Sequence, residues 1–205
     1  MKKMMFNDRY GLTQAVISGR KTVTRRVVKD AWWPIYKIEA EEIKGDIIHV
    51  IANNGKLVIE HKCPYKIGEI VAVAQCYADI HSELMIGDFG DDCYDSFKNA
   101  VVHDKAGWHN KMFVQADLMP HRIQITDLRI ERLQDISDDY FKEGITLLAS
   151  ADDGRIQWGY ADEHLRYYMF DSPREAFASL IDKVSGRGTW DRNPFVWRIE
   201  FELVK

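Results

Sequence analysis

The chain has 205 residues, 46% of them hydrophobic and 29% charged, which is typical of a globular protein with one hydrophobic core. Its formal net charge of −4 argues against a protein that coats long duplexes through many phosphate contacts, although a small site for one nucleotide stays open. Because no apolar run approaches about 20 residues and no signal-peptide core is present, the sequence predicts a cytoplasmic protein with no membrane partner.

A basic stretch, GRKTVTRR at residues 19–26, is the strongest local feature. The apolar spacing before it predicts a short helix over residues 9–17, which ends at Gly19 because glycine tolerates the left-handed conformation of a helix cap. The β-branched residues of the stretch favour an extended segment. Four cations in eight residues suit a phosphate or another anion, although cations near the end of a helix also stabilise its dipole.

Two arrangements of this basic stretch are open. In a regular strand, Lys21 and Arg25 face one side while Thr24 and Arg26 face the other. A loop or bulge would instead bring Lys21 and Thr24 together.

The middle of the chain is predicted to form strands joined by turns. Residues 47–51 and 57–60 predict a hairpin around Asn-Asn-Gly at residues 53–55, because Asn-Gly supplies the positive φ angles of a tight turn. Residues 70–74 form a continuous apolar run, typical of a strand buried on both faces. Residues 77–110 show no sustained period, which predicts a long loop.

Two strands and a short helix are predicted next. Residues 112–118 alternate in polarity and predict a strand. Residues 121–133 predict a longer strand in which the apolar parity shifts near Thr126, as a β-bulge would produce. A short helix with Ser137 as its N-cap is then predicted to end at Glu143.

The C-terminal part combines an irregular segment, a helix and a strand. Residues 146–171 are irregular, with aromatic side chains among Asp and Gly. A helix is predicted from an N-cap at Ser172 to Gly186, because Pro and Glu occupy the positions that they favour in a first turn. Residues 195–203 alternate between apolar and polar and predict a half-buried strand. The predicted fold class is α+β, with one curved mixed sheet or barrel.

Neither a disulfide framework nor a metal site is indicated. The three cysteines, Cys63, Cys76 and Cys93, form no C-x-x-C pair, and their odd number argues against a disulfide framework. His103 and His109, with Cys93, come nearest to a metal cluster, but their spacing matches no zinc pattern. The sequence therefore predicts reduced thiols, no bound metal ion and no cofactor.

Four blocks of the chain, taken in order, resemble the ASCH domain family, in particular its longer bacterial and phage members. The basic stretch fits the family signature G-x-K-x-x-T-x-R through Gly19, Lys21, Thr24 and Arg26. The other blocks are residues 64–77, the segments 119–123 and 133–144, and the pair formed by Ala176-Phe177 and Asn193-Pro194-Phe195-Val196-Trp197.

The resemblance implies a fold and a site. The fold would be a PUA-like mixed β-barrel with two or three flanking helices, as a single domain over residues 1–205 with variable insertions near 78–110 and 146–171. A cleft between barrel and helices would accept RNA or a modified nucleoside or nucleotide. A small ASCH enzyme hydrolyses N4-acetylcytidine with a Lys, a Thr and a Glu, which correspond by motif position to the catalytic candidates Lys21, Thr24 and Glu143.

The expected ligand contacts include one departure from the family pattern. Arg26 and Arg122 are expected to contact phosphate. Where relatives often have an aromatic residue, an arginine and an acid, this chain has Ala72, Ala74 and Gln75. If these positions line the cleft, with Gln75 as a ligand contact, the pocket is roomier and less charged than in those relatives.

Three functions are open at the level of sequence. Our prediction is a protein that binds RNA, a nucleoside or a nucleotide in a basic cleft. The first alternative is a metal-independent amidohydrolase of N4-acylated cytidine. The second is a non-catalytic structural or regulatory protein, in which Lys21, Thr24 and Glu143 form a buried hydrogen-bonded cluster.

Overall fold

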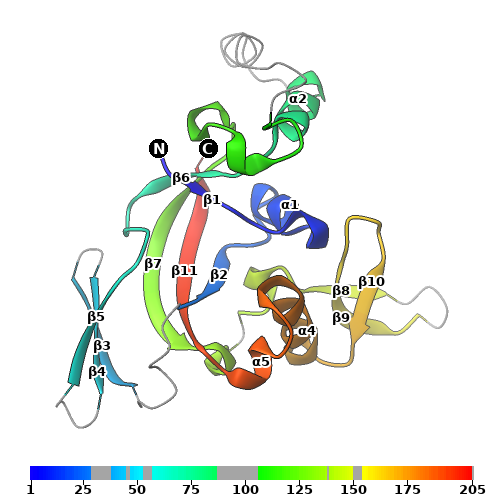
Figure 1. Ribbon diagram of the computed structural model, residues 1–205. Coiled ribbons are helices and arrows are strands. Elements are labelled where there is room, and N and C mark those ends of the chain that lie inside the picture. The colour runs from blue at the N-terminus through cyan, green and yellow to red at the C-terminus, as the bar shows by residue number, and fades with distance from the viewer. Residues whose placement is uncertain are drawn as a thin grey trace.

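A computed structural model describes residues 1–28, 38–44, 47–52, 57–86, 106–137, 139–149 and 154–204 (Figure 1). Within these ranges the protein has a mixed α+β fold with few helices, so the predicted α+β class is confirmed. The strands form three sheets, whereas one curved sheet or barrel was predicted. The described strands do not close into a barrel, and the PUA-like barrel stays a prediction. None of the described helices is long and apolar enough to cross a bilayer.

The central sheet has five strands in the order β1-β6-β7-β11-β2. Strand β1 pairs in parallel with β6, and the other neighbours are antiparallel. Figure 1 shows β7 and β11 as long, curved strands that run through the middle of the molecule. The bounds are Lys3–Met4 for β1, Val23–Val27 for β2, Ile70–Val73 for β6, Arg122–Arg132 for β7 and Phe195–Val204 for β11.

The pairing of β7 with β11 changes register within the strands. Glu200 pairs with Asp127, whereas the next residue, Phe201, pairs with Ile125, so that Thr126 is skipped. The predicted bulge near Thr126 is therefore confirmed. Since a bulge bends a strand and increases its twist, it contributes to the curvature of the central sheet.

A second sheet contains strands β3, Ile38–Lys44, β4, Ile47–Ala52, and β5, Leu57–Lys62. Strands β4 and β5 are antiparallel neighbours, which confirms the predicted hairpin. Its turn residues, like Ala31-Trp32-Trp33-Pro34 before the sheet, lie outside the described residues.

The third sheet corrects the prediction of an irregular segment over residues 146–171. The sheet consists of β8, Thr146–Ala149, β9, Ile156–Ala161, and β10, Tyr167–Phe170. Tyr160 of β9 stacks on Tyr168 of β10 with ring centroids 5.1 Å apart. Aromatic residues pack well across strands and stabilise this sheet. The interspersed Gly and Asp residues interrupt the apolar–polar alternation from which strands are predicted.

Two predictions between residues 77 and 118 were wrong. Helix α2, Tyr77–Ile86, begins the segment predicted as a loop, and its buried Ile80 packs in a small second core; residues 87–105 lie outside the described part. The segment predicted as a strand forms the 3₁₀ turns η3, Lys111–Phe113, and η4, Ala116–Leu118. Here the Lys3 ammonium binds the carbonyl oxygens of Lys111, Met112 and Val114, which takes backbone acceptors that a strand partner would use.

The remaining helices cover one face of the central sheet. They are the turn η1, Asp8–Tyr10, followed by α1, Leu12–Ile17, and the C-terminal pair α4, Pro173–Ser185, and α5, Thr189–Arg192. The Ser172 hydroxyl accepts a hydrogen bond from the amide of Glu175, 3.2 Å away, as the predicted cap requires. Phe177 of α4 and Val16 of α1 are buried in the main core with Phe195.

The helix predicted over residues 137–143 is shorter than expected. Among the described residues of this segment, only the 3₁₀ turn η6, Phe141–Glu143, forms. Another 3₁₀ turn, η5, Leu133–Asp135, precedes the segment. The N-cap position of η6 is Tyr140, so Ser137 does not cap it. Gly144 ends the turn with φ of 100°, a conformation that favours glycine, and thereby places Glu143 next to the basic stretch.

Candidate functional site

Strand β2 presents two faces with different surroundings. Each β2 side chain lies on the same face as the β11 residue with which it pairs. Arg26 pairs with Trp197, whereas Arg25 pairs with Arg198. Thr24 shares the face of Arg26 because strand side chains alternate. We call the side of Thr24 and Arg26 the pocket face and the side of Arg25 the charged face.

Lys21 joins the charged face just before the strand begins. Its ammonium donates hydrogen bonds to the carbonyl oxygen of Val23 at 2.7 Å, to the carbonyl oxygen of Glu143 at 2.9 Å and to Glu143 Oε2 at 2.6 Å. An ammonium has three protons, and here each has an acceptor. The Lys21 side chain is only 2% exposed. Lys21 is therefore fully bound by groups of the protein itself.

The second carboxylate oxygen of Glu143 is bound by Arg25. Arg25 Nη1 donates to Glu143 Oε1 at 2.9 Å, and Arg25 Nε donates to Glu131 Oε1 at 2.7 Å. Burial lowers the pKa of Lys21, while the neighbouring Glu143 carboxylate acts in the opposite direction. Both oxygens of Glu143 thus have cationic partners.

Further acids extend this cluster over the charged face. Arg25 and Arg198 lie directly opposite each other on paired strands, an arrangement that is unfavourable for like charges. Asp139 Oδ2 accepts from both, at 3.4 Å from Arg25 Nη2 and 2.7 Å from Arg198 Nη2. Glu200 also binds Arg198, at 2.9 Å. The charged face is a continuous network of paired charges.

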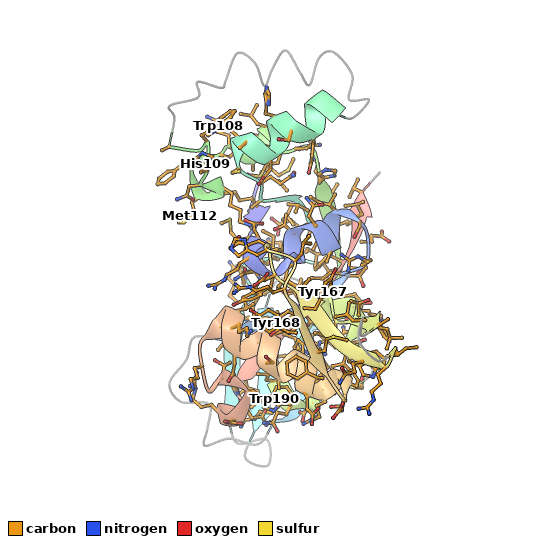
Figure 2. All side chains as sticks on the ribbon, turned by 90° about the vertical axis from the view of Figure 1, so that its right-hand side faces the viewer. Trp108, His109, Met112, Tyr167, Tyr168 and Trp190 are labelled. Atoms are coloured by element: carbon orange, nitrogen blue, oxygen red, sulfur yellow. The ribbon has the colours of Figure 1, made fainter. Side chains whose placement is uncertain are left out.

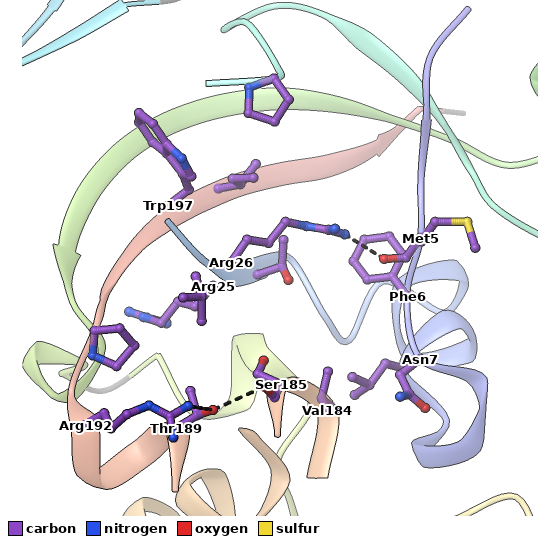
Figure 3. A pocket seen from close by; sticks show the side chains of 16 residues that line it. Met5, Phe6, Asn7, Arg25, Arg26, Val184, Ser185, Thr189, Arg192 and Trp197 are labelled. Carbon is purple, nitrogen blue, oxygen red and sulfur yellow. Dashed lines mark hydrogen bonds between the residues drawn. The ribbon is translucent and has the colours of Figure 1, made fainter. Parts of the chain in front are cut away.

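The pocket face borders a cavity of about 710 Å³, which we call the pocket. It lies between the N-terminal segment, strands β2 and β11, and the C-terminal end of α4 (Figure 3). Apolar and cationic side chains face it from different elements. Its lining consists of Met5, Phe6, Asn7, Leu12, Thr24, Arg25, Arg26, Val27, Pro64, Val184, Ser185, Thr189, Arg192, Pro194, Trp197 and Ile199. Arg25 borders the pocket although its guanidinium is bound by Glu131 and Glu143.

Arg26 is the cation that the protein satisfies least on this face. Its Nη2 donates to the carbonyl oxygen of Met5 at 2.6 Å, and its guanidinium carbon lies 5.9 Å from the centroid of the Phe6 ring. Its buried Nε has no hydrogen-bond partner among the described residues. Buried N–H groups are normally paired, so this donor is an exception among the described residues. Other atoms of Arg26 line the pocket.

The three catalytic candidates are placed in two groups. Lys21 and Glu143 are bound to each other on the charged face, as a shared site requires. Thr24 lines the pocket, and no hydrogen bond joins its hydroxyl to Lys21 or Glu143 in the part of the chain that the structure describes. The strand arrangement of the basic stretch is therefore the one observed.

The three expected ligand contacts are also separated. Arg26 lies in the pocket lining. Arg122 is exposed at the start of β7 and is not part of that lining. Gln75 is 1% exposed and donates from Nε2 to Glu83 Oε1 at 2.7 Å. It lines a separate cavity of about 120 Å³ with Asp8, Gly11, Thr13, Gln14 and Asp79.

The family positions that differ in this chain do not line the pocket. Ala72 and Ala74 are fully buried in the second core, against Ile80 of α2 and Met119. Small side chains at these two positions leave room for α2 to pack on the sheet. Ala72 and Ala74 therefore do not enlarge the pocket, in contrast to the expectation drawn from the resemblance.

Two lining residues, Phe6 and Arg192, were not expected from the sequence. Arg192 Nη2 donates to the Thr189 hydroxyl at 3.0 Å, so the short helix α5 directs it. Neither residue belongs to a motif, and only the fold brings them to β2. Trp197 is 6% exposed and also lines the pocket.

Among the described residues, no group of three or more His, Cys, Asp or Glu side chains is arranged to hold a metal ion. Cys93 and His103 lie outside these residues.

Comparison of the whole chain with protein-family models, with curated proteins and with solved structures gives no match.

Proposed function

We propose that this protein binds a nucleoside or nucleotide, free or as part of RNA, in the pocket beside β2. The single observation that carries the proposal is that Arg26 and Trp197, which pair across β2 and β11, line the same pocket. Arg offers a directional donor for phosphate or for a base carbonyl, and an aromatic ring offers a stacking surface for a base.

The size and chemistry of the pocket support this ligand class. Ligand pockets typically have volumes of about 300–1,000 Å³, and the pocket has about 710 Å³. Thr24, Asn7 and Ser185 add hydrogen-bonding groups to a largely apolar wall. Arg192 adds a second cation on the side of α5. A planar, polar and partly anionic ligand matches this combination.

The proposal includes membership of the ASCH family with a PUA-like fold. In its support, the signature residues Thr24 and Arg26 face the cavity, and the C-terminal block that contains Trp197 pairs with them. The bulged, curved pair of β7 and β11 is the kind of element from which small barrels are built.

Binding without hydrolysis is the activity that the geometry favours. Hydrolysis by the family set requires Lys21 to accept a proton from Thr24, but the Lys21 ammonium already donates to three acceptors. The buried Lys21–Glu143 pair instead fits the structural alternative, in which these side chains form a buried hydrogen-bonded cluster. Thr24, which that alternative included, is not part of the pair.

A thermal-shift titration tests the proposal. Cytidine, cytidine 5′-monophosphate and N4-acetylcytidine are added to the wild-type protein and to the Arg26→Gln variant. Arg20→Gln is the matched control, because Arg20 lies in the same basic stretch but is exposed and outside the pocket lining. We expect at least one compound to raise the melting temperature of wild type and control but not of Arg26→Gln.

No shift with any compound in the folded wild-type protein would contradict the proposal. The same samples are analysed for cytidine released from N4-acetylcytidine. Release that disappears in a Thr24→Ala variant would replace binding alone with the amidohydrolase function.

A further inference from the structure

Two arginines of the pocket are bound to different walls. Arg26 of β2 is bound to the N-terminal segment, because its Nη2 donates to the carbonyl oxygen of Met5 at 2.6 Å. Arg192 of α5 is bound within its own helix, because its Nη2 donates to the Thr189 hydroxyl at 3.0 Å (Figure 3). None of the 16 described residues that line the pocket is Asp or Glu. The two cations can therefore contact different parts of one ligand.

Arg192 keeps most of its hydrogen-bonding capacity. A guanidinium has five N–H donors. Among the described residues, Arg192 uses one of them on the Thr189 hydroxyl and one, from Nη1, on the carbonyl oxygen of Arg187 at 3.3 Å. Both acceptors are neutral, and the Arg192 side chain is exposed. Its position is thus fixed by the protein, while its other donors stay accessible to a ligand in the pocket.

An acid close to Arg192 is already bound by backbone amides. Asp182 Oδ2 accepts from the Gly188 amide at 2.9 Å, and Oδ1 accepts from the Trp190 amide at 2.8 Å. Burial alone would raise the pKa of Asp182, whereas these amides and, with the smallest of these effects, the charge of Arg192 lower it overall. In the described part of the chain, no hydrogen bond joins Arg192 to Asp182 or to its neighbour Asp191.

The C-terminal end of α4 opposes an anion at this wall. The carbonyl groups at the end of a helix together carry about half a negative charge. The Thr189 hydroxyl lies 2.6 Å from the carbonyl oxygen of Gly186 and 3.2 Å from that of Ser185, so it offsets part of this negative end. The full positive charge of Arg192 is larger than the half charge of the helix end. An anion in direct contact with Arg192 is therefore still stabilised.

We infer that Arg192 is the phosphate contact of the ligand whose base lies beside Trp197 and Arg26, so that the pocket selects phosphorylated nucleosides over free ones. This inference rests on the proposed function. Trp197 is 6% exposed and suits an apolar base, whereas a phosphate at the exposed Arg192 keeps part of its hydration. Arginine binds phosphate through two parallel N–H groups.

The phosphate is either the monoester of a nucleotide or the phosphodiester of an RNA residue. Three probes separate these sources: cytidine, cytidine 5′-monophosphate and a fluorescent cytidine-containing hexaribonucleotide without a terminal phosphate. Their affinities are measured for the wild-type protein and for the Arg192→Gln and Arg26→Gln variants. All proteins are full-length, and circular dichroism checks that they are folded.

The matched control is Arg187→Gln. It removes one positive charge from an exposed position outside the pocket lining and keeps the backbone carbonyl that Arg192 binds. Because Arg187 and Arg192 are joined by this hydrogen bond, the control changes the long-range charge of the same region. A difference between the two variants therefore reports direct contact with the phosphate.

We expect Arg192→Gln to bind a phosphate-bearing probe about tenfold more weakly than wild type and control, with unchanged affinity for cytidine. Arg26→Gln should weaken the binding of all three probes, because it loses a contact with the base. Weaker binding of cytidine 5′-monophosphate by Arg192→Gln identifies the monoester. Weaker binding of the hexaribonucleotide alone identifies the phosphodiester, and the salt dependence of its binding then falls as well.

Failure of this inference is distinguishable from failure of the proposed function. If cytidine binds the wild type and Arg192→Gln equals the control with all three probes, the phosphate role of Arg192 is wrong and nucleoside binding stands. The same holds if Arg192→Gln weakens cytidine as strongly as the phosphate-bearing probes. If none of the three probes binds the wild-type protein, the proposed function and the phosphate contact are wrong together.

Discussion

The two faces of strand β2 use the same residue types to opposite effect. On the charged face, Lys21 and Arg25 are bound by the protein's own acids, and Glu143 accepts from both. On the pocket face, Arg26 keeps a buried donor without a described partner, next to a cavity. The number of cations in the basic stretch therefore says little about function. What distinguishes Arg26 from Lys21 and Arg25 is that the described residues do not supply an acceptor for all of its buried donors.

The largest expected effect comes from breaking the charged face. Lys21→Met should lower the free energy of unfolding by about 3–5 kcal/mol, because Glu143 loses one cationic partner in a buried site. Urea unfolding measures this loss. In the control Arg20→Met, at an exposed position of the same stretch, stability should change by no more than about 0.5 kcal/mol. Nearly unchanged stability of Lys21→Met, together with lost ligand binding, would reverse the roles of the two faces.

A change on the pocket face should give the opposite result. The Thr24 side chain forms no hydrogen bond with a described residue, so Thr24→Val should leave stability within about 1 kcal/mol of wild type. Binding of cytidine 5′-monophosphate should weaken by about 1 kcal/mol, since one hydrogen-bonding group of the wall is lost. Calorimetric titration measures the binding. A large loss of stability with intact binding would place Thr24 among the structural residues.

The charged face should also determine part of the pH dependence of stability. Burial alone would raise the pKa of Asp139, but its hydrogen bond with Arg198 and the nearby cations lower it overall. A lowered pKa in the folded state means that the stabilisation is present above the unfolded value of about 3.9 and is lost as pH falls through the folded value. The free energy of unfolding should therefore fall less between pH 5 and pH 3 for Asp139→Asn than for wild type, which urea unfolding at both pH values measures. An equal fall in both proteins would show that Asp139 does not contribute to the pH dependence of stability.

The smallest effect is expected at the rim of the same network. Lys142 is 48% exposed and lies 3.5 Å from both Asp139 and Glu200. Exposed ion pairs of this kind contribute at most about 1 kcal/mol, so Lys142→Ala should change the unfolding free energy by less than that. A loss as large as that of Lys21→Met would show that the network acts as one unit, without a weak rim.

Much of the fold could be predicted because some segments carry their own signals. The N-cap at Ser172 predicts α4, and the broken alternation near Thr126 predicts the bulge. The prediction of a strand over residues 112–118 was wrong, although the apolar alternation of this segment is typical of a strand. The ammonium of Lys3, more than 100 residues away in the sequence, binds carbonyl groups at the start of the segment. A long-range side-chain contact of this kind leaves no local pattern.

The candidate site was predictable only in part for a similar reason. The approach of Glu143 to Lys21 follows from the resemblance, and the opposite faces of Thr24 and Lys21 follow from strand alternation. Periodicity gives no information about which face borders a cavity. The contributions of Phe6 and Arg192 depend on how the N-terminal segment and α5 pack around β2, which is a property of the whole fold.

The most direct test of this division of roles is a crystal structure of the protein soaked with cytidine 5′-monophosphate. The account predicts ligand density in the pocket, with the base beside Trp197, an acceptor of the ligand within hydrogen-bonding distance of the Arg26 guanidinium, and an unchanged Lys21–Glu143 pair. Density against Lys21 and Glu143, with their hydrogen bond broken, would contradict it and move the site to the charged face.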